Sequence, residues 1–561
     1  MRQPKWWQDA VVYQVYPRSF YDANGDGVGD LRGITEKLDY IASLGVDVVW
    51  SCPFFVSPWA DGGYDIADYR AVDPAFGTME DFEALVAGVH ARGMKFVMDF
   101  VGNHTSDEHP WFQAALADKN SPYHDYYTFR PGKDGREPSN WASIFGGSAW
   151  EYVPALDEYY LHLFAKKQPD LNWENPQVVE EVLSILEFWA DKGVDGYRLD
   201  AINYLYKEPG YPDVEPLPGS PYGFATAHYA NKPRVHEHFR TLRSRVMGPR
   251  GLSTVAEVAY LDDETARGYA DPARGELDML YLFDVLNVDQ QGFDKFSPLP
   301  LDLPRFKQAL AHWQQVLHGH GWLALFLGNH DQPRAVSRFG DEGRYRARSA
   351  KMLANAMYFL QGTPYLYQGE ELGMTNPHYT SLSQFKDVEA LDALRAGLAR
   401  GESEQHWLEL LNARSRDCGR APFSWNDGPA AGFTAGTPWM DPCADAAQIN
   451  AAAEENDPDS VLNFYRTLIR VRKGRPSVLW GRTDFLVPED PDLFVYTRTA
   501  EEEALLSVNN FSGEERHFPL PQGFAGGELL LSNCGAPQLD EEGVLTLRPW
   551  EGFVLLRKQQ P

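Results

Sequence analysis

The sequence contains no apolar run long enough to cross a membrane and has only four cysteines among its 561 residues. A transmembrane helix needs roughly 20 consecutive apolar residues, which no stretch approaches. The amino terminus lacks the apolar segment and small-residue cleavage site of a secretory signal. The cysteines are far apart and show no C-x-x-C spacing, which argues against a disulfide framework and fits a reducing compartment; they are Cys52, Cys418, Cys443 and Cys534. We therefore expect a cytoplasmic protein.

Positive charge is also scarce. Lys and Arg number 51 against 80 Asp and Glu, which gives a formal net charge of −29. Nucleic acid and anionic membrane surfaces would be repelled, so we expect neither as a partner. Aromatic residues reach 13%, and their flat rings can enlarge a core or cover the apolar faces of sugars. The chain is longer than one hydrophobic core supports, which predicts two or three domains, but whether it is a monomer or a homo-oligomer stays open.

Eight short β-branched and aromatic runs alternate with segments of helical periodicity. This alternation predicts a parallel sheet closed into a (β/α)8 TIM barrel, built from residues 1–103 and 172–485. Residues 104–171 are rich in Trp, Tyr, Pro and Gly and predict an irregular insertion after the third strand. Residues 486–561 contain short strand-like runs and predict a C-terminal antiparallel β-sandwich. The predicted barrel strands are 11–16, 46–51, 95–100, 195–200, 253–258, 279–285, 323–329 and 364–369.

Charged residues gather at the ends of four of these predicted strands. They are Asp99, Arg198 with Asp200, Glu257, and His330 with Asp331. Catalytic residues of such barrels come from the carboxyl ends of several strands. A lone Asp at such a place is more often the N-cap of the next helix. Four strand ends that carry carboxylates together favour a catalytic cluster.

Several motifs carry a family resemblance. The motifs DFVGNH (99–104), GYRLDAIN (196–203), VAEV (255–258) and LGNHDQPR (327–334) resemble the four signature regions of the α-amylase superfamily, glycoside hydrolase family 13. QPDLNWENP (168–176) is similar to the region that marks its oligo-1,6-glucosidase and α-glucosidase branch. The resemblance covers essentially the whole barrel, and several motifs in the right order are far more specific than one.

The resemblance implies a retaining glycosidase with Asp200 as nucleophile, Glu257 as general acid/base and Asp331 as the third carboxylate. Retaining enzymes hold the nucleophile and the acid about 5–5.5 Å apart, so that a covalent glycosyl-enzyme can form. Arg198 would keep Asp200 ionised, and Glu257 needs a raised pKa to hold its proton.

The resemblance also implies residues that bind a terminal glucose. An acid and an arginine would close the far end of the pocket, which explains action on a chain end. Asp61 is the acid, whereas the arginine could be Arg416 or Arg420. The expected substrate-binding residues are Asp61, Tyr64, His104, Phe145, Phe164, Gln168, Arg198, Ala201, His330 and Arg416.

The loop DANGDGVGD, residues 22–30, places oxygen donors at alternate positions. Hard cations such as Ca²⁺ take six to eight oxygen ligands from carboxylates, amides and backbone carbonyls. The loop resembles the calcium site of related α-glucosidases, which implies a structural Ca²⁺; the alternative is an Asx-rich turn before a helix. The implied ligands are Asp22, Asn24, Asp26, the carbonyl of Val28, and Asp30.

The substrate is expected to be a small oligosaccharide, and Ala201 bears on its linkage. Members specific for α-1,6 bonds usually carry Val after the nucleophile, and a smaller residue accompanies α-1,4 or broader activity. We therefore expect an exo-acting α-glucosidase that favours α-1,4 bonds in maltose and short oligosaccharides. The alternatives are an oligo-1,6-glucosidase, a trehalose-6-phosphate hydrolase and a sucrose- or trehalose-type transglucosylase (isomerase). A non-catalytic protein like the transporter heavy chains is remote, because it would need a membrane anchor.

Overall fold

Eight parallel strands form one sheet in the computed structural model, which describes residues 3–292 and 294–559. A parallel bridge between Leu280 and Leu323 joins the two ends of the sheet, so that the sheet closes into a barrel. This confirms the predicted (β/α)8 barrel, and each predicted strand overlaps an observed one. The strands are β1 Val12–Val15, β2 Val48–Ser51, β5 Lys95–Val101, β9 Gly196–Asp200, β10 Ser253–Val258, β11 Met279–Leu282, β14 Ala324–Leu325 and β15 Thr363–Tyr367.

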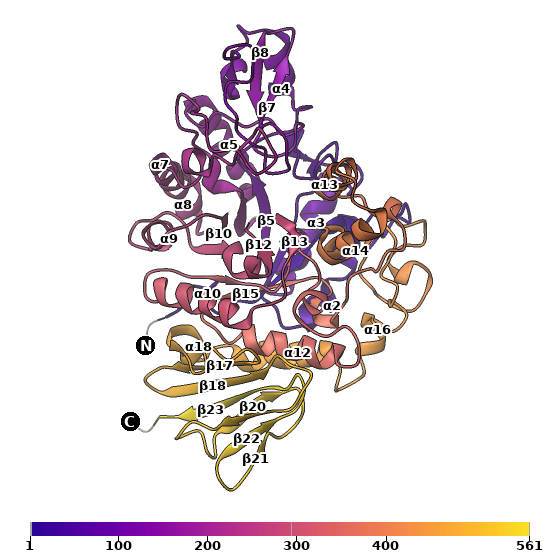
Figure 1. Cartoon of the computed structure of the whole chain (residues 1–561), viewed down its shortest axis with the longest axis vertical. Coiled ribbons are helices and arrows are strands. Elements are labelled where there is room, and N and C mark those ends of the chain that lie inside the picture. Colours follow the sequence, from indigo (N-terminus) through magenta and orange to yellow (C-terminus); the bar gives the residue numbers. More distant parts are fainter. Residues whose placement is uncertain (1–2, 293, 560–561) are drawn as a thin grey trace.

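The barrel strands are buried along almost their whole length, since side chains fill the interior and helices cover the outside. Helix α3 illustrates how the helices begin: Thr78 and Asp81 form a capping box at its first turn. The covering helices include α1 Leu31–Glu36, α2 Leu38–Ser43, α3 Met79–Ala91, α5 Pro176–Asp191, α7 Pro233–Leu242, α9 Asp263–Ala270, α10 Leu303–Val316, α11 Ala335–Phe339 and α12 Arg346–Met357 (Figure 1). Among the helices that the structure describes, none is both long and apolar enough to span a membrane.

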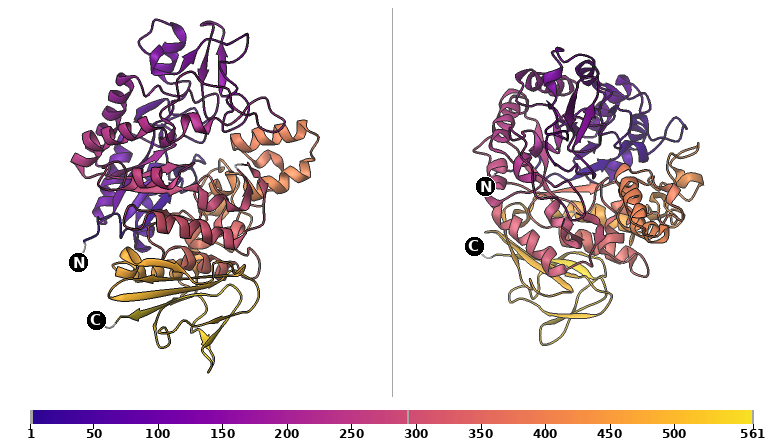
Figure 2. Two further views of the ribbon diagram at one scale, coloured as in Figure 1. Left: turned by 60° about the vertical axis from the view of Figure 1, so that its left-hand side comes forward. Right: turned by 45° about the horizontal axis from the view of Figure 1, so that its top comes forward.

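Two excursions leave the barrel at the carboxyl ends of its strands. The segment between β5 and α5 forms α4, Pro110–Ala117, and a three-stranded sheet of β6 Phe129–Arg130, β7 Trp150–Val153 and β8 Glu158–Leu161. After β15 the chain forms α13 Val388–Ala399, α14 Glu404–Arg414, α15 Asp417–Arg420 and α16 Ala451–Glu454. Helix α14 contacts β13 Asp294–Pro298, which pairs with β12 Gln290–Gln291 in a hairpin after β11. The helices of this second excursion are drawn in orange in Figure 2. Both excursions therefore overhang the same end of the barrel.

The C-terminal region forms two antiparallel sheets that share one apolar core, as predicted. It lies at the opposite end of the molecule from the insertion (Figure 1). Helices α17 Val461–Arg472 and α18 Pro476–Trp480 lead into it. Its strands are β16 Arg482–Phe485, β17 Leu493–Thr499, β18 Glu503–Asn510, β20 Glu528–Ser532 and β23 Gly552–Lys558 in one sheet, and β19 Arg516–Pro519, β21 Gln538–Leu539 and β22 Val544–Leu547 in the other.

Three buried cations, Lys307, Arg472 and Arg498, lie where the barrel meets this region. We call them the junction cations. The Lys307 ammonium on α10 donates to three backbone carbonyls of the loop before β17 and of its first residue, at 2.6–2.8 Å. Arg498 donates to two carbonyls of α18, and Arg472 to two carbonyls around the end of α12. At the junction, the buried cations are therefore stabilised by hydrogen bonds to backbone carbonyls.

Candidate active site

Three carboxylates predicted from the sequence meet in one pocket of about 240 Å³. Asp200 is the last residue of β9 and Glu257 lies near the end of β10. Asp331 lies in the segment that follows β14, which we call the Asp331 segment, residues 327–334. The carboxyl ends of these strands lie at one edge of the barrel, so the fold alone brings the three side chains together.

Arg198 connects the cluster. Its guanidinium donates to Asp99 at 2.7 Å, to Asp200 at 2.5 Å and to Glu257, and its side chain is fully buried. Although burial opposes a charge, these carboxylates hold the pKa of Arg198 well above its ordinary value. A single arginine thus aims the predicted nucleophile and the predicted acid at one point.

Two acids of the pocket have opposite protonation behaviour. Burial raises the pKa of Glu257 well above its usual range, and the negative charge of Asp200 adds to this against the effect of Arg198. Burial also opposes the ionisation of Asp331, but His330, Arg420 and Arg416 hold its pKa well below the usual range. A protonated acid therefore faces an ionised one, as acid-assisted glycoside cleavage requires.

His330 is held rigidly beside Asp331. Its ring stacks on Tyr64 with centroids 5.1 Å apart and on Tyr16 at 5.9 Å, and Nδ1 lies 2.9 Å from the side-chain amide of Gln14. Burial alone would lower the pKa of His330, but the Asp331 carboxylate, 3.1 Å from Nε2, raises it to about 10. Nε2 can therefore donate to a sugar hydroxyl or to Asp331.

Asp61 contacts one of the two candidate arginines, and the geometry distinguishes them. Arg416 donates to Asp61 at 2.8 Å, and Gln168 donates to the other oxygen of Asp61 at 3.0 Å. Arg420 instead donates to Asp331 at 2.6 Å and to the His330 carbonyl at 2.9 Å. Arg416 is thus the arginine that pairs with Asp61, and Arg420 orients the third carboxylate.

The remaining predicted residues form the pocket walls. Tyr64 donates to Asp99 at 3.0 Å, while the rings of Phe145 and Phe164 pack 5.8 Å apart. His104 packs against Phe164 and contacts the Gln168 amide at 3.0 Å. The structure thus brings together every residue predicted to bind glucose.

Ala201 differs from the other wall residues in its backbone. It has φ 43° and ψ 33°, a left-handed conformation in which β-branched residues are rare. Ala201 lines the same pocket as Asp200 and Glu257.

Sequence patterns missed two charged residues at the pocket mouth, Lys295 and Glu389. Lys295 lies on β13 and forms an ion pair with Glu389, the second residue of α13. Glu389 also lies 3.5 Å from Arg416. Neither belongs to a recognisable motif; the only available signal was that their segments follow the sixth and eighth strands, whose ends face the site.

A second missed pair joins the insertion to the barrel. The Lys207 ammonium lies 2.7 Å from Asp170 and donates to Asn103 at 3.0 Å, and both members of the ion pair are almost completely buried. Lys207 follows β9, Asn103 lies two residues beyond the end of β5, and Asp170 lies where the insertion returns. This contact fixes His104, the neighbour of Asn103, relative to Asp200.

The acidic loop forms a series of Asx turns. Asp22 accepts from the amides of Gly25 and Gly27, and Asp30 accepts from Ala23 and Gly33. Within residues 3–292 and 294–559, no group of three or more His, Cys, Asp or Glu side chains is arranged to hold a metal. In the same ranges no Lys or Arg pairs with the carboxylates of the loop. The negative charge of Asp22, Asp26 and Asp30 would suit a hard cation, although their oxygens already accept hydrogen bonds from backbone amides.

Comparison with known proteins adds to this geometry. The family model "Alpha amylase, catalytic domain" matches residues 14–481, and "Alpha-amylase SusG C-terminal domain" matches residues 493–554. The chain is 48% identical over 552 residues to an oligo-1,6-glucosidase of Parageobacillus thermoglucosidasius, with 98% of each chain covered. It is 46% identical over 560 residues to a trehalose-6-phosphate hydrolase of Bacillus subtilis (strain 168), again with 98% of each covered. The crystal structure of an isomaltulose synthase from Klebsiella sp. LX3 superposes with a TM-score of 0.94 at 40% identity, covering 99% of this chain and 100% of that one.

Proposed function

Since the chain belongs to the α-amylase catalytic-domain family of glycoside hydrolases, we propose that it removes single terminal α-linked glucose units from short oligosaccharides with retention of configuration. The contact of Arg198 with both Asp200 and Glu257 carries this proposal, because it aims nucleophile and acid at one bond. The Asp61–Arg416 pair supports exo action, since a closed end admits only a chain terminus.

The reaction takes two steps with this arrangement. The Asp200 carboxylate attacks the anomeric carbon while Glu257 gives its proton to the glycosidic oxygen, so the aglycone leaves as an alcohol and a covalent glucosyl ester remains. Glu257, now ionised, takes a proton from water, whose oxygen attacks the same carbon and releases glucose and the Asp200 carboxylate. Asp331 and His330 hold the sugar hydroxyls and favour the distorted ring of the transition state.

For the linkage we propose α-1,6, because relatives at up to 48% identity over nearly the whole chain are oligo-1,6-glucosidases. The α-1,4 preference expected from the sequence rests mainly on Ala201 and stands as the second candidate. A phosphorylated disaccharide is disfavoured, since the cationic side chains in the described lining are Lys295 and Arg416, each already paired with carboxylates.

Product analysis distinguishes these candidates. Purified enzyme is given isomaltose, maltose, trehalose 6-phosphate and sucrose at equal concentrations, and products are separated by chromatography. We expect the highest kcat/KM on isomaltose, with glucose as product. Faster turnover of maltose would favour the second candidate, and isomerised sucrose would indicate a transglucosylase.

We also propose that the loop of residues 22–30 binds one Ca²⁺ through the five residues named above. Its regular alternation of oxygen donors and its lack of a paired cation support this. Bound Ca²⁺ would stabilise the native state by mass action. Chelation should lower Tm, added Ca²⁺ should restore it, and Asp26→Asn should weaken both effects. A chelator-insensitive Tm would favour the simple Asx turn.

A further inference from the structure

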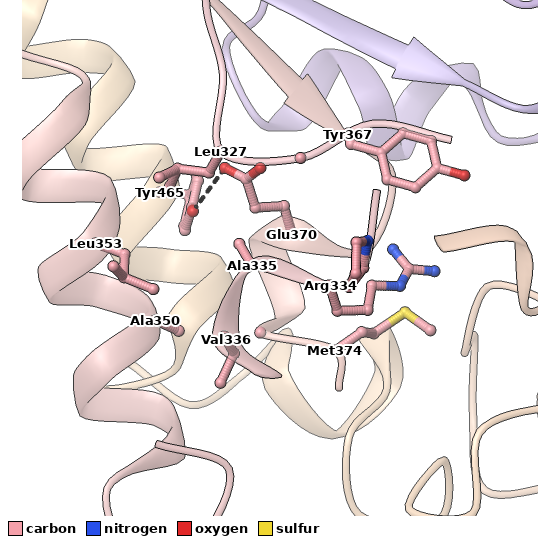
Figure 3. A pocket seen from close by; sticks show the side chains of 13 residues that line it. Leu327, Arg334, Ala335, Val336, Ala350, Leu353, Tyr367, Glu370, Met374 and Tyr465 are labelled. Atoms are coloured by element: carbon pink, nitrogen blue, oxygen red, sulfur yellow. Dashed lines mark hydrogen bonds between the residues drawn. The ribbon is translucent and has the colours of Figure 1, made fainter. Parts of the chain in front are cut away.

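A cavity of about 20 Å³ lies directly behind the Asp331 segment (Figure 3). Leu327, Gly328 and Pro333 of that segment line one side, and α11, α12 and the turn after β15 line the others. A water molecule needs about 10–15 Å³ of such space, so the cavity has room for one. It is separate from the sugar pocket, because the two share no lining residue among those the structure describes.

Among the residues that the structure describes, two buried polar atoms that belong to the cavity lining have no hydrogen-bond partner: Oε2 of Glu370 and Nε of Arg334. Glu370 enters beside Tyr465, and Arg334 enters from another side (Figure 3). The other oxygen of Glu370 accepts from the hydroxyls of Tyr358 and Tyr465, the latter at 3.0 Å. Buried polar groups are nearly always paired, so an orphaned oxygen beside a water-sized cavity indicates a ligand there.

The surroundings of Glu370 favour its neutral form. Burial raises the pKa of Glu370 to about 8, and the two tyrosine hydroxyls and Arg334 only partly offset it. The protonated acid has a hydrogen that needs an acceptor, and water is the small neutral molecule that fits. The titratable or charged groups that influence it most are Tyr358, directly after α12, Tyr465 from α17, Glu371 from its own turn, and Arg334 from the Asp331 segment.

We propose that the cavity holds one water bound to Glu370, and that Glu370 is a positioning residue for the Asp331 segment. Arg334 is the last residue of that segment and donates to the carbonyls of Gln368 at 2.5 Å and Ala421 at 3.4 Å. Ala421 directly follows Arg420, which binds Asp331. A negative charge on Glu370 would attract Arg334 and draw it from these carbonyls, loosening the support of Asp331. The link to catalysis rests on the proposed role of Asp331.

Three variants test this inference. Glu370→Gln keeps the shape of the neutral acid, Glu370→Leu removes its polarity, and Glu371→Gln is the control, since that neighbour does not line the cavity. Hydrogen exchange of residues 327–334, corrected for intrinsic rates, is measured at pH 6.5 and 9. In the wild type and Glu371→Gln we expect faster exchange at pH 9, and in Glu370→Gln no such change. Equal pH dependence in all three proteins would overturn the proposal.

Kinetics and crystallography complete the test. We expect Glu370→Leu to lower kcat about tenfold and Glu370→Gln to restore it to within about twofold, which a purely space-filling role would not produce. A crystal structure at high resolution should show a density peak within hydrogen-bond distance of Oε2. An empty cavity would refute the water site. The exchange experiment needs no substrate, so it stays informative even if the proposed activity is wrong.

Discussion

Two regions of the molecule bury cations but pair them differently. One is the edge of the barrel around the pocket, where the strands end, which we call the catalytic edge; the other is the junction of the barrel with the C-terminal sheets. At the catalytic edge, Arg198, Arg416 and Arg420 are paired with carboxylates. At the junction, Lys307, Arg472 and Arg498 are held by backbone carbonyls. Carboxylates raise the pKa of Arg198 and Arg416, whereas burial lowers the pKa of all three junction cations.

This difference in pairing suggests different roles: the catalytic edge supports the reaction, and the junction supports the folded structure. Carboxylates can exchange protons and can turn from an arginine to a substrate, so a carboxylate-paired cation keeps reactive groups charged and aimed. Backbone carbonyls are fixed dipoles that neither titrate nor leave. We therefore expect changes at the catalytic edge to alter turnover and pH response, and changes at the junction to alter the free energy of unfolding.

The largest effect should follow Asp200→Asn. The amide cannot attack the anomeric carbon, so kcat on every glucoside should fall about 10⁴-fold or more. The fold should persist, because Arg198 still has two carboxylate partners. Steady-state assays and thermal unfolding of the same preparation measure both. Activity within tenfold of the wild type would refute the nucleophile assignment.

Glu257→Gln tests the role of the general acid at the catalytic edge. Loss of the general acid should lower kcat on isomaltose about 10²–10⁴-fold, whereas aryl glucosides with good leaving groups need little protonation in the first step. In the wild type the raised pKa of Glu257 keeps the proton at neutral pH, so activity is lost as the pH rises through that pKa. Parallel assays on both substrates check this; equal losses would argue against an acid role.

Arg498→Met tests the junction. It leaves two α18 carbonyls and the Gln314 side-chain oxygen without this donor, which should lower the free energy of unfolding by about 3 kcal/mol. The kcat at 25 °C should stay unchanged. Arg482→Met is the matched control, since Arg482 is exposed and pairs with Asp484, and should cost about 0.5 kcal/mol or less. Chemical denaturation measures both; a loss of kcat without a loss of stability in Arg498→Met would reverse the comparison.

The pH dependence of stability tests the pairing of Asp387 with the buried arginines. Although burial opposes its ionisation, Arg416 and Arg420 lower the pKa of Asp387 to about 2. A depressed carboxyl pKa contributes stability that is present above the unfolded pKa and lost as the pH falls through the folded one. Between pH 4 and 2 the wild type should therefore lose about 2 kcal/mol more than Asp387→Asn. Urea unfolding over this range provides the measurement, and parallel curves for the two proteins would count against the ion pair.

The smallest effect concerns linkage. Ala201→Val adds a branched side chain at a left-handed position on the pocket wall. We expect the ratio of kcat/KM for isomaltose to that for maltose to rise about tenfold, roughly 1.4 kcal/mol of discrimination. Ala201→Gly keeps the backbone and removes the methyl group, so its ratio should move the other way. An unchanged ratio in both variants would remove Ala201 from the specificity argument.

Strand ends and motifs allowed the barrel and the three carboxylates to be predicted, because the hydrophobic period and the position of a residue can both be read along the sequence. Pairings between distant segments did not. The choice between Arg416 and Arg420 depended on a helix after β15 whose direction no pattern encodes. Lys295 and Glu389 meet because β13 and α13 overhang the same mouth, 94 residues apart in sequence. The role of the junction cations could not be predicted from the sequence, because every residue has a backbone carbonyl and no pattern marks those that accept from a buried cation.

Arg198 has a pharmacological consequence. One guanidinium serves the three carboxyl groups of Asp99, Asp200 and Glu257, so the cluster has fewer cations than carboxyl groups. A glucose mimic that carries a protonated nitrogen near its anomeric position would supply the missing positive charge, as the oxocarbenium-like transition state does during the reaction. Iminosugars should therefore inhibit this enzyme far better than neutral analogues of the same shape.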